Sequence, residues 1–127
     1  MWNVTVFIDL SKAFDQIWID GLLFKLFNVG IRGYVLNWIK NWLNNRTIQV
    51  KINNTLSDIK ILLNGIPQGS CLSPLLFAIM LSDFPKLQSQ FLALAFADDL
   101  TLSRSANTLQ IALHNLQNDL RTLSEWC

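Results

Sequence analysis

Two adjacent aspartates, Asp98 and Asp99, stand between two apolar runs in the stretch FLALAFADDLTLS at residues 91–103. Neighbouring carboxylates repel, and a carboxylate in a dry environment takes up a proton unless a cation compensates its charge. The flanking runs read as two strands, and acidic residues are common in hairpin turns. The pair therefore marks either an exposed turn or a metal site. The two interpretations are compatible, because a tight hairpin presents both carboxylates at the end of its sheet.

Another strand is predicted near the start of the chain, in the segment NVTVFID at residues 3–9. Val4, Val6 and Ile8 recur at every second position, which is typical of a strand with one buried face. This strand ends at Asp9 and delivers a carboxylate at its tip. An aspartate at a strand end is also a common helix or turn cap, so spacing alone leaves both roles open.

If the two segments pair, Asp9, Asp98 and Asp99 converge at one end of a sheet. Hard divalent cations such as Mg²⁺ bind few protein carboxylates and keep their other positions for water and substrate phosphates. Two such ions can activate an attacking oxygen and stabilise a leaving one. The predicted constellation is that of a nucleotidyl-transfer site.

The composition limits the other possibilities. Of 127 residues, 51% are hydrophobic and 15% charged, which is unusually apolar and suggests a piece of a larger protein that covers the exposed apolar surface. The net charge of +1 gives no electrostatic footprint for nucleic acid. The longest apolar runs fall far short of the roughly 20 residues that span a bilayer, so no membrane partner is expected.

The cysteine content bears on the compartment. Cys71 and Cys127 form no spaced framework, which fits a reducing compartment and an intracellular protein, in the nucleus or the cytoplasm. The start of the chain offers no signal peptide. Cys71 itself is expected to be a small core residue.

Helical periodicity predicts most of the remaining elements. One helix is expected from Ser11 as its cap, and another from Pro74 to its stop at Pro85, apolar all round and so buried. A third helix is predicted from an apolar stripe that consists of Val35, Trp38, Ile39, Trp42 and Leu43. The last helix, from about Asn107, has a stripe that consists of Leu109, Ala112, Leu113, Leu116, Leu120 and Leu123.

A second hairpin is predicted at residues 46–63, followed by the loop GIPQGS at 65–70. The mixed order of strands and helices favours an α+β layer, a sheet with helices on one face. No repeat or linker interrupts the chain, so a single domain over residues 1–127 is expected.

Three segments together resemble the reverse transcriptases of non-LTR (LINE-type) retrotransposons, in particular those of jockey-like elements. FIDLSKAFDQIW at 7–18 is similar to the first palm motif of that family, GIPQGSCLSPLLF at 65–77 to the second, and FADDL at 96–100 to the third. The resemblance implies a polymerase palm, a small antiparallel sheet backed by the helices around 74–84 and 107–126.

By the same resemblance, Asp9, Asp98 and Asp99 are the catalytic residues and the ligands of two Mg²⁺ ions, with Mn²⁺ as an alternative. Asp9 and Asp98 are implied as the main ligands, with Asp99 nearby and less directly engaged. The implied reaction is RNA-directed DNA synthesis, in which a primer 3′-hydroxyl attacks the α-phosphate of a dNTP opposite an RNA template.

The resemblance also implies a set of nucleotide-binding residues. They are Leu10, Ser11, Lys12, Ala13, Phe14, Gln68 and Gly69. Backbone N–H groups of the first four would meet the triphosphate as a helix N-terminus meets an anion. Phe14 would exclude a ribose 2′-hydroxyl by steric contact, and Gln68 and Gly69 would contact the nascent base pair. Without the resemblance, Phe14 is equally well a core aromatic residue, Lys12 a solubilising one and PQG an ordinary loop.

The remaining acidic residues are expected to be structural, Asp15 as a local backbone cap. The fingers and thumb of the family are expected to be missing, so the chain is interpreted as a palm fragment that is inactive or nearly inactive alone. The alternatives are a truncated, non-catalytic remnant that acts at most as a binding module, and a metal-dependent nuclease, in which Phe14 and GIPQGS would have no role.

Overall fold

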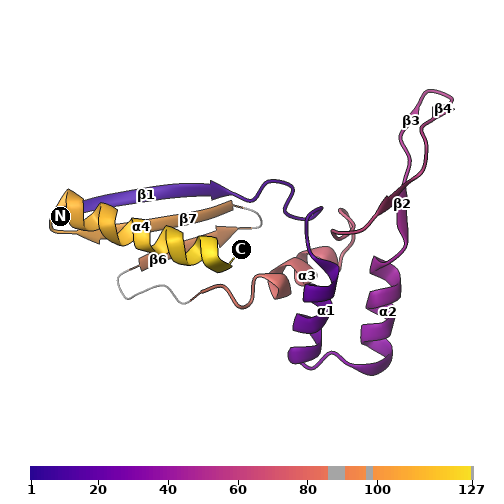
Figure 1. Ribbon diagram of the computed structural model, residues 1–127, viewed down its shortest axis with the longest axis horizontal. Helices are drawn as coiled ribbons and strands as arrows, with labels where there is room; N and C mark the ends of the chain where they lie inside the picture. Colours follow the sequence, from indigo (N-terminus) through magenta and orange to yellow (C-terminus); the bar gives the residue numbers. More distant parts are fainter. Residues whose placement is uncertain (86–90, 97–98, 127) are drawn as a thin grey trace. The chain divides into compact units, whose positions relative to one another are not determined.

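The computed structural model describes residues 1–85, 91–96 and 99–126, the segment 91–96 by its backbone alone. The chain is a mixture of helices and small antiparallel sheets, as predicted for an α+β fold (Figure 1). It divides into two compact units. One unit comprises Met1–Ser11 with Asp83–Cys127, and the other comprises Lys12–Ser82.

The first unit is a three-stranded antiparallel sheet with one helix packed on it. Strand β7 (Asp99–Ala106) lies between β1 (Trp2–Asp9) and β6 (Phe91–Phe96). Helix α4 (Leu109–Trp126) packs against β1 and β7 (Figure 1). The predicted support of the sheet by the last helix is confirmed. The predicted support by the helix around 74–84 stays a prediction, because that helix belongs to the other unit.

The core of this unit lies between the sheet and α4. Leu100 and Leu102 of β7 pack against Leu116 and Leu123 of α4. Alternate residues of β1 complete the layer, and they are Val4, Val6 and Ile8. The two-residue period in the sequence therefore predicted the buried face of this strand correctly.

A buried ion pair joins β7 to α4. Arg104 donates two hydrogen bonds to Asp119, from Nε to Oδ2 at 2.5 Å and from an Nη to Oδ1 at 2.7 Å. Only 5% and 6% of the two side chains are exposed. The bond to Asp119 raises the pKa of Arg104, against the lowering effect of burial. A two-pronged contact of this kind fixes the rotation of the helix about its axis.

The predicted apolar stripe of the last helix is partly wrong. Leu109 and Leu113 are 41% and 48% exposed, whereas Asp119 is buried. The face that meets the sheet runs through Ala112, Leu116, Asp119 and Leu123. Hydrophobicity alone could not find it, because one position of the buried face is a carboxylate that needs Arg104.

The second unit contains three helices and a long hairpin. Helix α1 (Ile19–Asn28) packs against α2 (Gly33–Leu43) and α3 (Ser73–Met80). In the hairpin, β2 (Arg46–Ile48) pairs with β5 (Lys60–Leu62), and β3 (Lys51–Ile52) pairs with β4 (Thr55–Leu56). The hairpin predicted at residues 46–63 is confirmed, and so is the helix predicted from the stripe between Val35 and Leu43. Figure 1 shows the hairpin reaching away from α2 to a tip between β3 and β4.

Three helix predictions in this unit, and the expected burial of Cys71, need correction. No helix begins at Ser11, because residues 11–15 form turns and Lys12 has a φ of 56°. Helix α3 is not buried all round, since Leu75 is 56% exposed. Cys71 is exposed and not a core residue. The stripe on α2 is also only partly buried, because Val35 and Trp38 are more than half exposed.

Within the part of the chain that the structure describes, no helix is long and apolar enough to cross a membrane. The longest helix, α4, carries a polar face along its whole length.

Removing the carboxylate of the ion pair is expected to destabilise the first unit strongly. In Asp119→Ala the buried guanidinium of Arg104 loses its carboxylate, and the free energy of unfolding should fall by about 3–5 kcal/mol. Urea unfolding followed by circular dichroism measures the change. Glu125→Ala, at an exposed position of the same helix, is the control and should cost less than about 0.5 kcal/mol. Equal effects of the two substitutions would contradict the structural role of the pair.

Candidate active site

Asp9 and Asp99 lie directly opposite each other on neighbouring antiparallel strands. Side chains of such partners project from the same face, with Cβ atoms about 4.5–5.5 Å apart. Both aspartates are exposed. The predicted pairing of the first strand beside the hairpin is confirmed, and it brings two of the three expected carboxylates together.

The register also corrects the predicted turn. Asp99 is the first residue of β7 and pairs with Phe96 of β6 as well as with Asp9 of β1. Asp99 therefore belongs to the strand ladder. Asp98 lies outside the described residues, so its place near the other two carboxylates stays a prediction.

The carboxylate pair faces away from helix α4. Val4, Val6 and Ile8 of β1 point to the core, so Asp9 projects from the opposite face. On that face a row of polar side chains follows the two strands, where Ser103 Oγ lies 3.0 Å from Thr5 Oγ1 and donates to Asn3 Oδ1 at 2.7 Å. Asp9 and Asp99 are exposed on this face, as is Phe7 at 79%, whereas Ser103 is buried; a ligand therefore has access to the carboxylates at the end of the sheet.

The chemistry of the pair suits a hard cation. Carboxylate oxygens are the ligands that Mg²⁺ and Mn²⁺ prefer, and a cation bound between the two carboxylates would offset the repulsion of their like charges. Among residues 1–85, 91–96 and 99–126, no group of three or more His, Cys, Asp or Glu side chains has a geometry suited to a metal. The described donor set is therefore two carboxylates, and Asp98 is the expected third.

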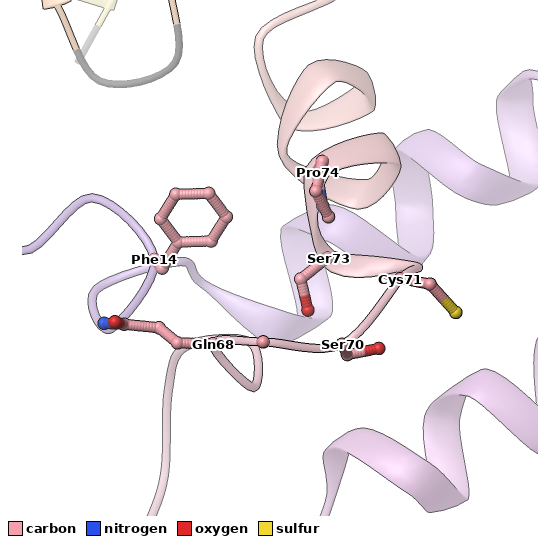
Figure 2. A pocket seen from close by; sticks show the side chains of 7 residues that line it. Phe14, Gln68, Ser70, Cys71, Ser73 and Pro74 are labelled. Atoms are coloured by element: carbon pink, nitrogen blue, oxygen red, sulfur yellow. The ribbon is translucent and has the colours of Figure 1, made fainter.

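A cavity of about 420 Å³ lies in the second unit, beside the turn that carries Phe14 (Figure 2). It is lined by Phe14, Gln68, Gly69, Ser70, Cys71, Ser73 and Pro74. Every one of these residues falls in the first or the second sequence motif. The predicted substrate residues Phe14, Gln68 and Gly69 are thus brought together around one cavity.

Two backbone hydrogen bonds hold the motifs together. The N–H of Gly65 donates to Ile17 O, and the N–H of Ile66 donates to Phe14 O, both at 2.8 Å. A Cβ at Gly65 would come within 2.6 Å of the carbonyl oxygen of Asp15. The two loops that contain Asp15 and Gly65 lie so close together that position 65 requires a glycine.

The loop at one side of the cavity turns into helix α3. Gly69 has a φ of 86° and open space where a Cβ would be. The positive φ at position 69 therefore favours glycine, and the open space beside it leaves room for a ligand. Ser73 is buried and donates its hydroxyl to Pro67 O at 2.5 Å, which ties the start of α3 to the loop.

Phe14 is half-buried and stacks on Phe77 of α3, with ring centroids 4.8 Å apart and an interplanar angle of 21°. Phe14 therefore packs on the core on one side and lines the cavity on the other, and its contact with a sugar stays a prediction. The sequence prediction missed Phe77, whose position at the end of the second motif was the available signal.

The turn after Asp9 differs from its prediction. The N–H groups of Asp15 and Gln16 both donate to Lys12 O, at 2.9 and 3.0 Å. Since no helix begins between residues 10 and 13, the comparison with a helix N-terminus is wrong. Contact of the backbone N–H groups of Leu10, Ser11, Lys12 and Ala13 with an anion stays a prediction for a turn.

The stacking of Phe14 on Phe77 is expected to appear as an energetic coupling. Single changes Phe14→Leu and Phe77→Leu keep most of the apolar volume but remove a ring, and the double variant should be less destabilised than their sum by about 0.5–1.5 kcal/mol. Urea unfolding of the four proteins gives the coupling. Phe24→Leu combined with Phe77→Leu is the control, because Phe24 is 67% exposed on α1. Strict additivity for Phe14 and Phe77 would contradict the contact.

Comparisons with known proteins cover nearly the whole chain. The family model for reverse transcriptase (RNA-dependent DNA polymerase) matches residues 2–127. The probable RNA-directed DNA polymerase from transposon BS of Drosophila melanogaster is 35% identical over 129 residues, which cover 96% of the chain. The RNA-directed DNA polymerase from the mobile element jockey of the same species is 32% identical over 98% of the chain. The chain spans 14% of the length of each of these relatives.

Proposed function

The chain belongs to the reverse transcriptase (RNA-dependent DNA polymerase) family, and on that premise we propose that it forms the palm of a polymerase that adds dNTPs to a primer 3′-hydroxyl by two-metal nucleotidyl transfer. The resemblance to non-LTR retrotransposon enzymes is confirmed by the match to the jockey and BS polymerases. The palm assignment, the metals and the competence of these 127 residues are the proposal.

The observation that carries the proposal is the cross-strand pair of Asp9 and Asp99. The β1–β7 ladder places the two aspartates opposite each other, and both are exposed and so accessible to a ligand. Asp98 is proposed as the third member. When bound, two Mg²⁺ or Mn²⁺ ions would lower the pKa of the primer hydroxyl and stabilise the charge on the pyrophosphate.

The cavity residues are proposed to bind the nucleotide. Phe14 would lie against the sugar and exclude a 2′-hydroxyl, because its ring is held in place by Phe77. Gln68 and Gly69 would contact the nascent base pair, and the turn at Leu10, Ser11, Lys12 and Ala13 would contact the triphosphate. Asp9 and Asp99 belong to one unit, and the cavity residues Phe14, Gln68 and Gly69 belong to the other.

RNA template, DNA primer and dNTP are the proposed partners of the whole polymerase. The net charge of residues 1–127 is only +1. Most of the positive charge that binds nucleic-acid phosphates is therefore expected from other segments of the polymerase. The fingers and thumb are the proposed source. Placement in the nucleus or the cytoplasm remains part of the proposal.

Loss of one carboxylate is expected to weaken metal binding. Isothermal titration calorimetry with Mg²⁺ should show at least about tenfold weaker binding for Asp9→Asn and for Asp99→Asn. Loss of a residue that only supports a metal ligand already lowers metal affinity by about 10–100-fold. Asp58→Asn is the matched control, because it changes the same charge at an exposed position in the loop between β4 and β5. Binding by Asp9→Asn as tight as that of the wild type would rule out the site.

The isolated chain is expected to give no detectable extension of an oligo(dT) primer on poly(rA) with dTTP and Mg²⁺. Chemistry of this kind needs the primer end and the triphosphate held in a reactive geometry as well as the metals. The assay is a denaturing gel of labelled primer. Extension that disappears in Asp98→Ala would contradict this expectation and would show that the 127 residues suffice.

A further inference from the structure

One contact at the cavity has no counterpart in the proposed function. The side chain of Gln68 donates a hydrogen bond from Nε2 to Oδ1 of Asp15, at 3.1 Å and across 53 positions of the sequence. Both residues belong to the unit Lys12–Ser82. Gln68 lines the cavity, whereas Asp15 is not among the residues that line it. Figure 2 shows the carboxamide of Gln68 extending toward the turn that carries Phe14 and away from Ser70.

The backbone around this contact is fixed from both sides. The hydrogen bonds from Gly65 to Ile17 and from Ile66 to Phe14 flank Asp15 and set its distance from the loop of Gln68. The missing side chain at Gly65 lets the loop approach the backbone of Asp15 to within van der Waals distance. The meeting of Asp15 and Gln68 is therefore a consequence of how the two motifs pair.

Arg46 supports the same arrangement from the start of the hairpin. Its guanidinium donates to three carbonyl oxygens, those of Leu43 at 2.9 Å, Asn64 at 3.0 Å and Gly65 at 2.5 Å. Burial lowers the pKa of Arg46, and the charge of Asp15 opposes that effect. The carboxylate of Asp15 thus interacts electrostatically with Arg46 and accepts a hydrogen bond from the amide of Gln68.

The chemistry of the two groups decides which way the amide points. An ionised carboxylate only accepts hydrogen bonds, so the NH₂ end of the Gln68 carboxamide must face Asp15. The amide oxygen is then directed elsewhere and keeps its lone pairs for a donor group of a ligand. Without Asp15, the two ends of the carboxamide can exchange by rotation about one bond.

We propose that Asp15 is a positioning residue, which sets the orientation of the Gln68 carboxamide for nucleotide binding. This inference rests on the proposed function, because it takes the cavity to be the nucleotide site. It also revises the expected role of Asp15. The carboxylate acts on a side chain of the second motif and is more than a local backbone cap.

The first test measures the contact itself. In ¹⁵N-labelled chain, the side-chain NH₂ signals of Gln68 should shift and exchange faster with water in Asp15→Ala. Asp15→Asn should have an intermediate effect, because its amide oxygen still accepts a hydrogen bond but its NH₂ group also lets the Gln68 oxygen face it. Asp58→Ala removes the same charge from an exposed position of the same unit and should leave the signals unchanged. Gln68 signals that are identical in Asp15→Ala and the wild type would overturn the proposal.

The second test measures nucleotide binding by the same chain, with dTTP and Mg²⁺ followed by chemical shift changes at the cavity. Asp15→Ala should weaken binding about three- to tenfold, and Asp15→Asn should weaken it less, since it keeps an acceptor but no longer fixes the orientation of the Gln68 amide. Gln68→Ala should weaken binding to a similar degree. The double variant should bind no more weakly than Gln68→Ala alone, since Asp15 acts through Gln68.

The outcomes separate the two claims. Additive effects of Asp15→Ala and Gln68→Ala on dTTP binding would overturn the positioning role alone, because the wild-type cavity would still bind the nucleotide. Absence of dTTP binding by the wild type, with its Gln68 signals still dependent on Asp15, would contradict the nucleotide site. It would overturn the proposed function and the positioning role together and leave only a structural contact.

Discussion

The antiparallel ladder between β1 and β7 is the constraint on which the candidate site depends. Its register places Asp9 opposite Asp99, and a slip of one residue would turn one of the two carboxylates toward the core. The register is held from the other face, where Ile8 and Leu100 pack under α4. Apolar residues on one face thus determine where the charged residues lie on the other.

The buried pair of Arg104 and Asp119 extends this constraint to the helix. Charges are expensive to bury, and a pair is tolerated here because both oxygens of the carboxylate accept hydrogen bonds from the guanidinium. The pair allows one rotation of α4 on the sheet. Apolar contacts alone would tolerate several rotations, so the polar contact adds specificity to the packing that supports β7.

The sequence predicted the parts of the molecule that depend on local pattern. The two-residue period of Val4, Val6 and Ile8 identified the buried face of β1, and the motifs identified Phe14 and Gln68 as neighbours of one site. The turn after Asp9 was predicted as a helix because composition does not reveal the left-handed conformation of Lys12. The ladder position of Asp99 depends on the pairing register, which the two aspartates alone do not fix.

The contacts that could not be predicted join residues far apart in the chain. Arg104 meets Asp119 only when strand β7 and helix α4 have packed together. Asp15 meets Gln68 only when their two loops have come together. No periodicity marks such partners in advance. For Asp119 the available signal is chemical, because a carboxylate on an apolar helix face needs a donor nearby.

The most direct measurement of the carboxylate site is the paramagnetic broadening of amide signals by Mn²⁺ in the ¹⁵N-labelled chain. If the ion binds between Asp9 and Asp99, amides at that end of the ladder, such as Leu10 and Leu100, should broaden first. Amides at the opposite end, at Asn3 and Ser105, should remain sharp. Broadening centred on another acidic position, such as Asp58 or Glu125, with sharp signals at Leu10 and Leu100, would contradict a metal site at the end of this sheet.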